Sequence, residues 1–104
     1  MMEPLDDLLD SETARPRHIV ELFLRIAPAD LATIQRGADV KTLQSAAHKM
    51  KGDAAMLGLS RLHASCRAVD ALGKQGDFAG ARALVPDIER DFAATCDALR
   101  ALIS

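Results

Sequence analysis

The sequence predicts an all-α fold: an antiparallel four-helix bundle with a short lead-in helix at the N-terminus. Apolar residues recur at steps of three and four along the long segments, and no segment alternates with the period of two that a half-buried strand needs. Alanine and leucine, two strong helix formers, are abundant. Because the connections between the periodic segments are short, successive helices should run antiparallel.

Composition limits the size and the class of the protein. The chain has 104 residues, of which 49% are hydrophobic and 27% charged, an ordinary balance for one compact domain. A formal net charge of -2 is too balanced for a nucleic-acid-binding domain. No segment approaches the roughly 18 apolar residues of a membrane span, and the acidic N-terminus lacks a signal-peptide pattern. We therefore expect a cytoplasmic protein without membrane contact.

Two cysteines, Cys66 and Cys96, lie far apart at apolar helical positions. In a cytoplasmic protein such residues are usually reduced and buried, so we expect core thiols, with a disulfide as the less favoured alternative.

The N-terminal region differs from the remainder. Residues 3–10 carry leucines among acids and are expected to form the lead-in helix, followed by a polar loop over 11–16. We assign residues 1–15 to this lead-in and residues 16–104 to the bundle.

The first long helix is expected to start near Pro16, because proline is tolerated in a first turn, and to reach Gly37. Pro28 should kink or break it, since proline removes a donor and crowds the preceding turn. The expected buried stripe consists of Ile19, Val20, Phe23, Leu24 and Ile26.

The central helix is expected over residues 40–57. Asp39 is a suitable N-cap. Gly58 suits the left-handed position that ends a helix, and Leu59 can make the hydrophobic contact of a Schellman motif.

The third helix should be capped by Ser60 and end at Gly73 and Gly76. Its expected buried face consists of Leu59, Leu62, Cys66, Val69 and Leu72.

Asp77 is expected to cap one last long segment. Pro86 should kink this segment, because it deprives the Arg82 carbonyl of its helical donor. The apolar positions recur at three and four: Phe78, Ala81, Val85, Ile88, Phe92, Thr95, Leu99 and Leu102.

Three residues on the exposed side of the central helix could act together. Lys51 and Gly52 follow His48 by three and four positions, so all three are neighbours on the helix surface. A neutral imidazole nitrogen can be a nucleophile, and an ammonium can stabilise an anion placed on it. Glycine costs up to about 1 kcal/mol within a helix, which suggests that a partner must approach closely. From these residues alone, a plain surface histidine is an equal alternative.

The same side of the helix is the expected partner-binding surface. Lysines surround His48, and no acid lies between Val40 and Gly52, so an acidic partner should be attracted. The expected contact residues are Lys41, Gln44, Lys49, Gly52 and Ala55.

The run from His48 to Gly58, followed by Leu62 and Cys66, resembles the histidine phosphotransfer (HPt) domain family. The family pattern is a histidine, a Lys-Gly pair three and four residues later, a glycine ten residues later, and spaced apolar residues on the next helix. The resemblance covers about residues 16–104 and includes the first long helix and the Gly-Asp pair before the last one.

Two positions depart from the family pattern. Met50 stands where the family usually has leucine, a volume-conserving change. Asp53 stands where a small residue is usual. Helical rotation turns it roughly 140° from His48, so we expect it to lie off the transfer face and to pair with Lys49.

The resemblance implies that the chain is a phosphorelay carrier. It also implies that the protein comes from a bacterium. His48 would accept a phosphoryl group from an aspartyl phosphate on a receiver domain and pass it to another receiver, Lys51 would support the added charge, and Gly52 would admit the partner. The receiver would supply Mg²⁺, while this chain would bind no cofactor and act as a monomer. A hybrid sensor histidine kinase is a further candidate partner. Without a Gly-rich phosphate loop, the chain should not be a kinase by itself.

Two other interpretations stay open. The first is a helical-bundle interaction module that binds receiver or kinase domains but is never phosphorylated. The second is a metal site, because His63 and Cys66 lie three apart on one helix and could face an ion together with His48. The apolar position of Cys66 and the lack of a third spaced ligand favour a core cysteine beside a boundary histidine.

Overall fold

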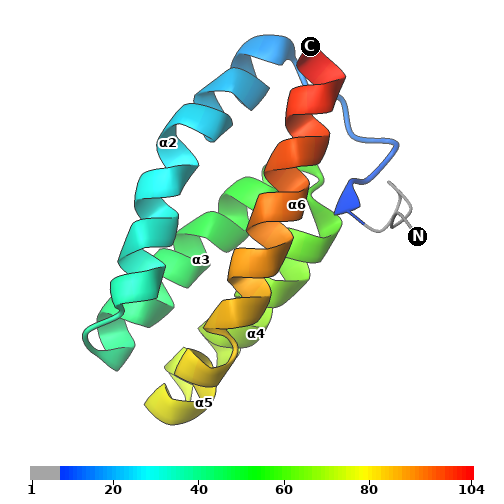
Figure 1. Ribbon diagram of the computed structural model, residues 1–104. Helices are drawn as coiled ribbons and strands as arrows, with labels where there is room; N and C mark the ends of the chain where they lie inside the picture. Colours follow the sequence, from blue (N-terminus) through cyan, green and yellow to red (C-terminus); the bar gives the residue numbers. More distant parts are fainter. Residues whose placement is uncertain (1–7) are drawn as a thin grey trace.

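The computed structural model describes residues 8–104, which form an antiparallel bundle of helices (Figure 1). The all-α prediction is thereby confirmed. The helices in this part of the chain are α2 (Arg17–Arg36), α3 (Val40–Leu57), α4 (Ser60–Lys74), the short α5 (Phe78–Ala83) and α6 (Val85–Ile103). The bundle measures 39 × 28 × 20 Å. The lead-in helix predicted over 3–10 lies largely outside the described residues and stays a prediction.

The core lies along the bundle axis, where each long helix contributes one apolar stripe. Phe23 of α2 and Phe92 of α6 place their rings 6.3 Å apart between centroids, which joins the first and last long helices. On α3 the stripe is fully buried and leaves the opposite side of the helix to solvent. The α3 stripe consists of Leu43, Ala47, Met50, Ala54 and Leu57.

Helix α2 departs from the sequence prediction in its buried stripe, and of the kink or break predicted at Pro28 the break does not occur. The helix continues through Pro28, and because Pro28 is exposed, the carbonyl that it deprives of a donor can face water. Ile26 was expected in the buried stripe but is 45% exposed. Ala27 is buried instead, in line with Phe23 one turn earlier, since a helical turn places i and i+4 on one face.

Helix α3 has the predicted bounds and the predicted ends. The Asp39 carboxylate accepts a hydrogen bond from the Thr42 backbone N–H at 2.7 Å, which confirms the N-cap. Gly58 has a φ of 66°, a left-handed conformation that favours glycine. The N–H of the buried Leu59 donates to the Ala54 carbonyl at 2.8 Å, which completes the Schellman motif.

The segment that precedes α2 lies across this end of α3. Arg15 donates from Nε to the Leu57 carbonyl at 2.7 Å, and the Asp10 N–H donates to the Gly58 carbonyl at 2.6 Å. Leu8 and Leu9 are buried in the core. The described N-terminal residues therefore satisfy carbonyls that the end of α3 leaves without helical donors.

Helix α4 begins and ends differently from its prediction. Its N-cap position is Leu59, without a side-chain hydrogen bond, so the predicted Ser60 cap is wrong. Gly73 does not end the helix, which runs to Lys74. The next turn does contain Gly76, with a φ of 77°.

The last segment is two helices rather than one kinked helix. Asp77 accepts from the Gly80 N–H at 2.9 Å, which confirms the predicted cap. The helical segment is interrupted at Leu84, and Pro86 lies in the first turn of α6. There its missing N–H leaves no helical carbonyl unsatisfied. Within residues 8–104 no helix combines the length and the hydropathy needed to cross a bilayer.

Candidate functional site

His48 lies on the exposed side of α3, as helical rotation predicts, and its side chain is 57% exposed. Gly52 is exposed on the next turn, and a Cβ added there would meet no atom within 4 Å. Lys41 and Ala55 are also exposed. The α3 surface around His48 is therefore open to a large partner.

A buried carboxylate of α4 lies beneath this surface. Asp70 is 2% exposed, and both of its oxygens are hydrogen-bonded. The amide of Gln44 donates to Oδ1, and three groups share Oδ2. The donor–acceptor distances are 2.6 Å for Gln44 Nε2, 3.1 Å for His48 Nδ1, 2.7 Å for Lys51 Nζ and 3.3 Å for Lys74 Nζ.

These contacts keep Asp70 ionised. Burial raises the pKa of the Asp70 carboxyl, but the hydrogen bonds from its four partners outweigh burial and hold this pKa well below its usual range. Two of the partners are lysines, so the negative charge is balanced where it is buried. Asp70 is thus a carboxylate at neutral pH.

The carboxylate selects one form of the His48 ring. A carboxylate can only accept hydrogen bonds, so Nδ1 of His48 must donate to Asp70. A neutral imidazole that carries its proton on Nδ1 leaves Nε2 with a free lone pair. Because the side chain is more than half exposed, this arrangement gives a nucleophilic nitrogen that faces solvent, with the Lys51 ammonium held close by.

The structure separates Lys49 from this site. Its ammonium contacts both carboxylate oxygens of Asp30 on α2, at 2.8 and 3.0 Å, and this contact raises the pKa of Lys49. The direct ion pair of Lys49 is therefore with Asp30 and not with Asp53 as predicted, although the nearby charge of Asp53 also helps to raise the pKa of Lys49. A two-oxygen contact with a neighbouring helix replaces a pairing along one helix that contributes only about 0.2–0.5 kcal/mol.

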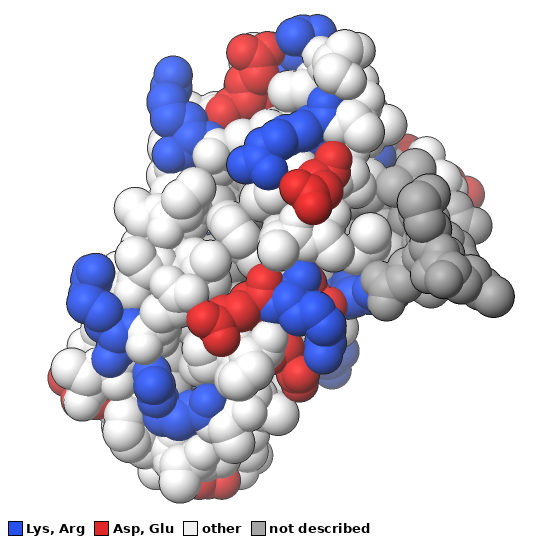
Figure 2. Space-filling model, viewed as in Figure 1, with Lys and Arg blue, Asp and Glu red and all other residues white. Residues whose placement is uncertain are grey.

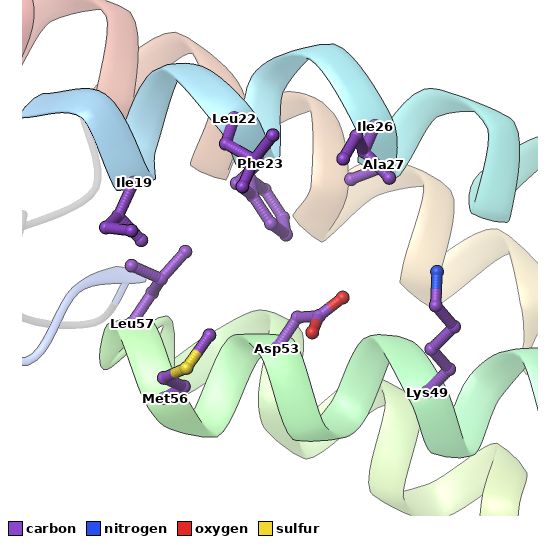
Figure 3. A pocket seen from close by; sticks show the side chains of 9 residues that line it. All are labelled: Ile19, Leu22, Phe23, Ile26, Ala27, Lys49, Asp53, Met56 and Leu57. Atoms are coloured by element: carbon purple, nitrogen blue, oxygen red, sulfur yellow. The ribbon is translucent and has the colours of Figure 1, made fainter.

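Asp53 lies off the His48 face, as predicted, and lines an apolar groove of about 240 Å³ between α2 and α3. Figure 3 shows its carboxylate and the Lys49 side chain extending toward α2. The groove also contains the exposed side chains of Leu22, Ile26 and Met56.

The positive surface expected around His48 is weaker than the local sequence suggests. Asp70 pairs with Lys51 and Asp30 pairs with Lys49, although no acid lies between Val40 and Gly52 in the sequence. Figure 2 displays a different face, with α2 and α6 in front, and there basic and acidic side chains are also interspersed rather than gathered by sign.

Asp70 was not among the site residues predicted from the sequence. A signal for it was present, because Asp70 follows Cys66 by four positions and adjoins Val69, both on the buried face of α4. An acidic residue on an apolar face is rare unless it is paired. The partner could not be found in the same way, since it belongs to another helix.

The alternative metal site has no support in the structure. The described residues contain no group of three or more His, Cys, Asp or Glu side chains that could hold an ion. Cys66 and Cys96 are buried free thiols, as predicted. Burial raises the pKa of Cys66 to about 12, which disfavours the thiolate that a metal would bind.

Comparison with known proteins gives one match. The family model described as the Hpt domain matches residues 18–103, from the first turn of α2 to the end of α6, and this range includes the complete His48–Asp70 site. No curated protein and no solved structure matches the chain. The chain belongs to the Hpt domain family, whose members are phosphocarriers, not kinases, that carry out histidine phosphotransfer with receiver domains in two-component phosphorelays.

Proposed function

We propose that His48 of this chain accepts a phosphoryl group on Nε2 from an aspartyl phosphate of one receiver domain and transfers it to an aspartate of another. The observation that carries this proposal is the hydrogen bond from His48 Nδ1 to the buried Asp70. It leaves Nε2 with a lone pair on a side chain that is 57% exposed, which is the requirement for attack on a group held by a second protein.

In the forward step, the Nε2 lone pair forms a bond to phosphorus, and the bond from phosphorus to the receiver's aspartyl oxygen breaks. The leaving group is the receiver's carboxylate, so no external proton is needed. The Nδ1 proton stays between the ring and Asp70, whose negative charge compensates the positive charge that develops on the ring. In the second step another receiver's carboxylate attacks phosphorus, and the N–P bond breaks.

Lys51 supports the phosphoryl group in this scheme. Its ammonium is held 2.7 Å from Asp70 Oδ2, the same oxygen that His48 contacts. The side chain is 23% exposed, so it can shift toward an anion on the ring without leaving a buried position. A cation beside the site of transfer stabilises the charge on the moving group.

The surface around His48 is the proposed docking site. Gly52 and Ala55 have small or no side chains, so the next turns of α3 offer no bulk that would keep a partner away. Lys41 adds a positive charge that attracts an acidic receiver pocket. The Mg²⁺ required for phosphoryl transfer would be held by the receiver. We further propose that the chain acts as a monomer in the bacterial cytoplasm, without a nucleotide site of its own, and that a hybrid sensor kinase is one source of its receiver partner.

The test is transfer of ³²P from a phosphorylated receiver domain to the purified chain. The expected result is label on the wild type and none on His48→Gln. His18→Gln serves as the matched control, because His18 is also exposed but lies at the start of α2, and it should take label normally. A wild type that binds several phosphorylated receivers and takes no label would overturn the proposal and leave a non-phosphorylated interaction module.

A further inference from the structure

Gln44 has a different place in the site from the one its sequence position suggests. It was expected to contact a partner, but its amide is turned toward α4 and donates to Asp70 Oδ1 at 2.6 Å. Only the NH₂ group of the amide can donate to a carboxylate, so the orientation of the amide is fixed by chemistry. Gln44 is also partly buried, unlike the exposed Lys41 and Ala55.

Because of this contact, the two oxygens of Asp70 have different hydrogen-bond partners. Gln44 occupies Oδ1, and the cationic groups and the imidazole share Oδ2. If the amide were absent, Oδ1 would be a buried carboxylate oxygen without a donor. The carboxylate would then be drawn to turn so that both oxygens meet the two lysines, and the fixed acceptor for His48 Nδ1 would be lost.

Gly73 allows helices α3 and α4 to approach each other closely at Gln44. A Cβ added at Gly73 would lie 2.5 Å from Cβ of Gln44, 2.8 Å from its Cγ and 3.2 Å from its Cα. The last of these atoms belongs to the backbone, so a larger residue would push α3 and α4 apart at this point. Gly73 lies inside α4, three residues after Asp70, where glycine disfavours the helix.

We propose that Gln44 is a positioning residue that orients Asp70 toward His48. We also propose that the lack of a side chain at Gly73 of α4 makes the room that the Gln44 side chain needs. The proposal rests on the proposed function of His48, since it concerns the readiness of that ring for transfer. It replaces the partner contact expected of Gln44 with a role inside the bundle.

The first readout is the ¹⁵N spectrum of the His48 ring in the unphosphorylated protein, where the Nδ1–H form should dominate. The variant Gln44→Met, which keeps the length of the side chain and removes the donor, should raise the share of the Nε2–H form. Gln75→Met makes the same change at an exposed glutamine beyond α4 and should leave the spectrum unchanged. An unchanged tautomer ratio in Gln44→Met would overturn the proposal, whether or not the chain is ever phosphorylated.

The second readout separates positioning from partner contact. Gln44→Met should slow phosphorylation by a receiver and by the small donor phosphoramidate to a similar extent, by about tenfold for one lost hydrogen bond to a charged group. Slowing with the receiver alone would show that Gln44 contacts the partner, and would overturn the proposal. Gly73→Ala should reproduce the tautomer shift of Gln44→Met. If its spectrum stays that of the wild type in a folded protein, the role assigned to Gly73 is wrong.

Discussion

Asp70 Oδ2 lies 3.1 Å from His48 Nδ1, although the two residues are 22 positions apart in the sequence and belong to different helices. One partner is almost fully buried and the other is more than half exposed. Because the buried carboxylate can only accept a hydrogen bond, it favours the tautomer of the exposed ring in which Nδ1 carries the proton and Nε2 the lone pair.

Replacing Asp70 by asparagine should slow transfer to His48. The amide oxygen can still accept from Nδ1, but the negative charge that compensates the developing charge on the ring is lost. Hydrogen bonds to charged groups are roughly twice as strong as neutral ones, so we expect a rate at least about tenfold lower in single-turnover transfer from a receiver.

The matched control for this change is Asp91→Asn. Asp91 is an equally buried acid on α6 that contacts Ser65 and Arg90, away from α3. It should lose stability without losing the transfer rate. Equal slowing of both variants would mean that the effect of Asp70 is a general loss of structure.

The stabilising effect of Asp70 should depend on pH. Its pKa is lowered in the folded state, so its charge stabilises the fold fully above the ordinary pKa of about 4, and this contribution is lost progressively as the pH falls from that value through the lowered pKa. At pH 7, Asp70→Asn should lower the free energy of unfolding by about 1–3 kcal/mol. Urea denaturation at a series of pH values should show the gap between the two proteins narrowing in acid. A gap that stays constant from pH 7 to pH 3 would contradict this account.

The two lysines on Asp70 should contribute unequally to transfer. Lys51 lies 2.7 Å from Oδ2 and is 23% exposed, whereas Lys74 lies at 3.3 Å and is 56% exposed. Lys51→Ala should therefore slow transfer or shorten the phosphohistidine lifetime more than Lys74→Ala does. Lys51→Ala should also lower the free energy of unfolding by about 1–3 kcal/mol, because it takes a donor from a buried carboxylate, whereas loss of the more exposed Lys74 should cost less. The lifetime is measured by loss of label after the donor is removed. Arg17→Ala, which removes an exposed cation paired with Glu21, is the control, and an equal effect of all three changes would argue for net charge alone.

A long side chain at Gly52 should block docking and leave the bundle intact. Since a Cβ there meets no neighbour within 4 Å, Gly52→Gln should keep or raise the free energy of unfolding, by up to about 1 kcal/mol from helix propensity. Transfer from a receiver should slow strongly, while labelling by phosphoramidate should continue at the wild-type rate. If the receiver still transfers to Gly52→Gln as fast as to the wild type, the close approach assigned to Gly52 is wrong.

Arg15 should matter for stability only. It donates to the Leu57 and Gly58 carbonyls at the end of α3, far along the helix from His48. Arg15→Ala should lower the free energy of unfolding by about 1 kcal/mol for the lost contacts, measured by urea denaturation, with an unchanged transfer rate. A slowed transfer at full stability would show that this end of α3 takes part in docking.

Features that depend on neighbouring residues were predictable from the sequence. Asp39 and Gly58 mark both ends of α3 because a cap is a contact within one turn, and helical rotation alone places His48 on the exposed side. Prolines were harder to interpret. The sequence shows that Pro28 and Pro86 lack a donor, but exposure lets the helix continue at Pro28, whereas at Pro86 the chain starts a new helix.

The sequence by itself determined the helical bundle, the bounds of its central helix and the open surface around His48, because each follows from periodicity and local capping. Only the tertiary structure decided which carboxylates meet the lysines and the imidazole. Asp70 belongs to α4 and Asp30 to α2, and their contacts with His48 and Lys49 depend on how closely the helices approach one another. Periodicity shows which face of a helix is buried, but the residue that meets it from another helix is set by the packing between them.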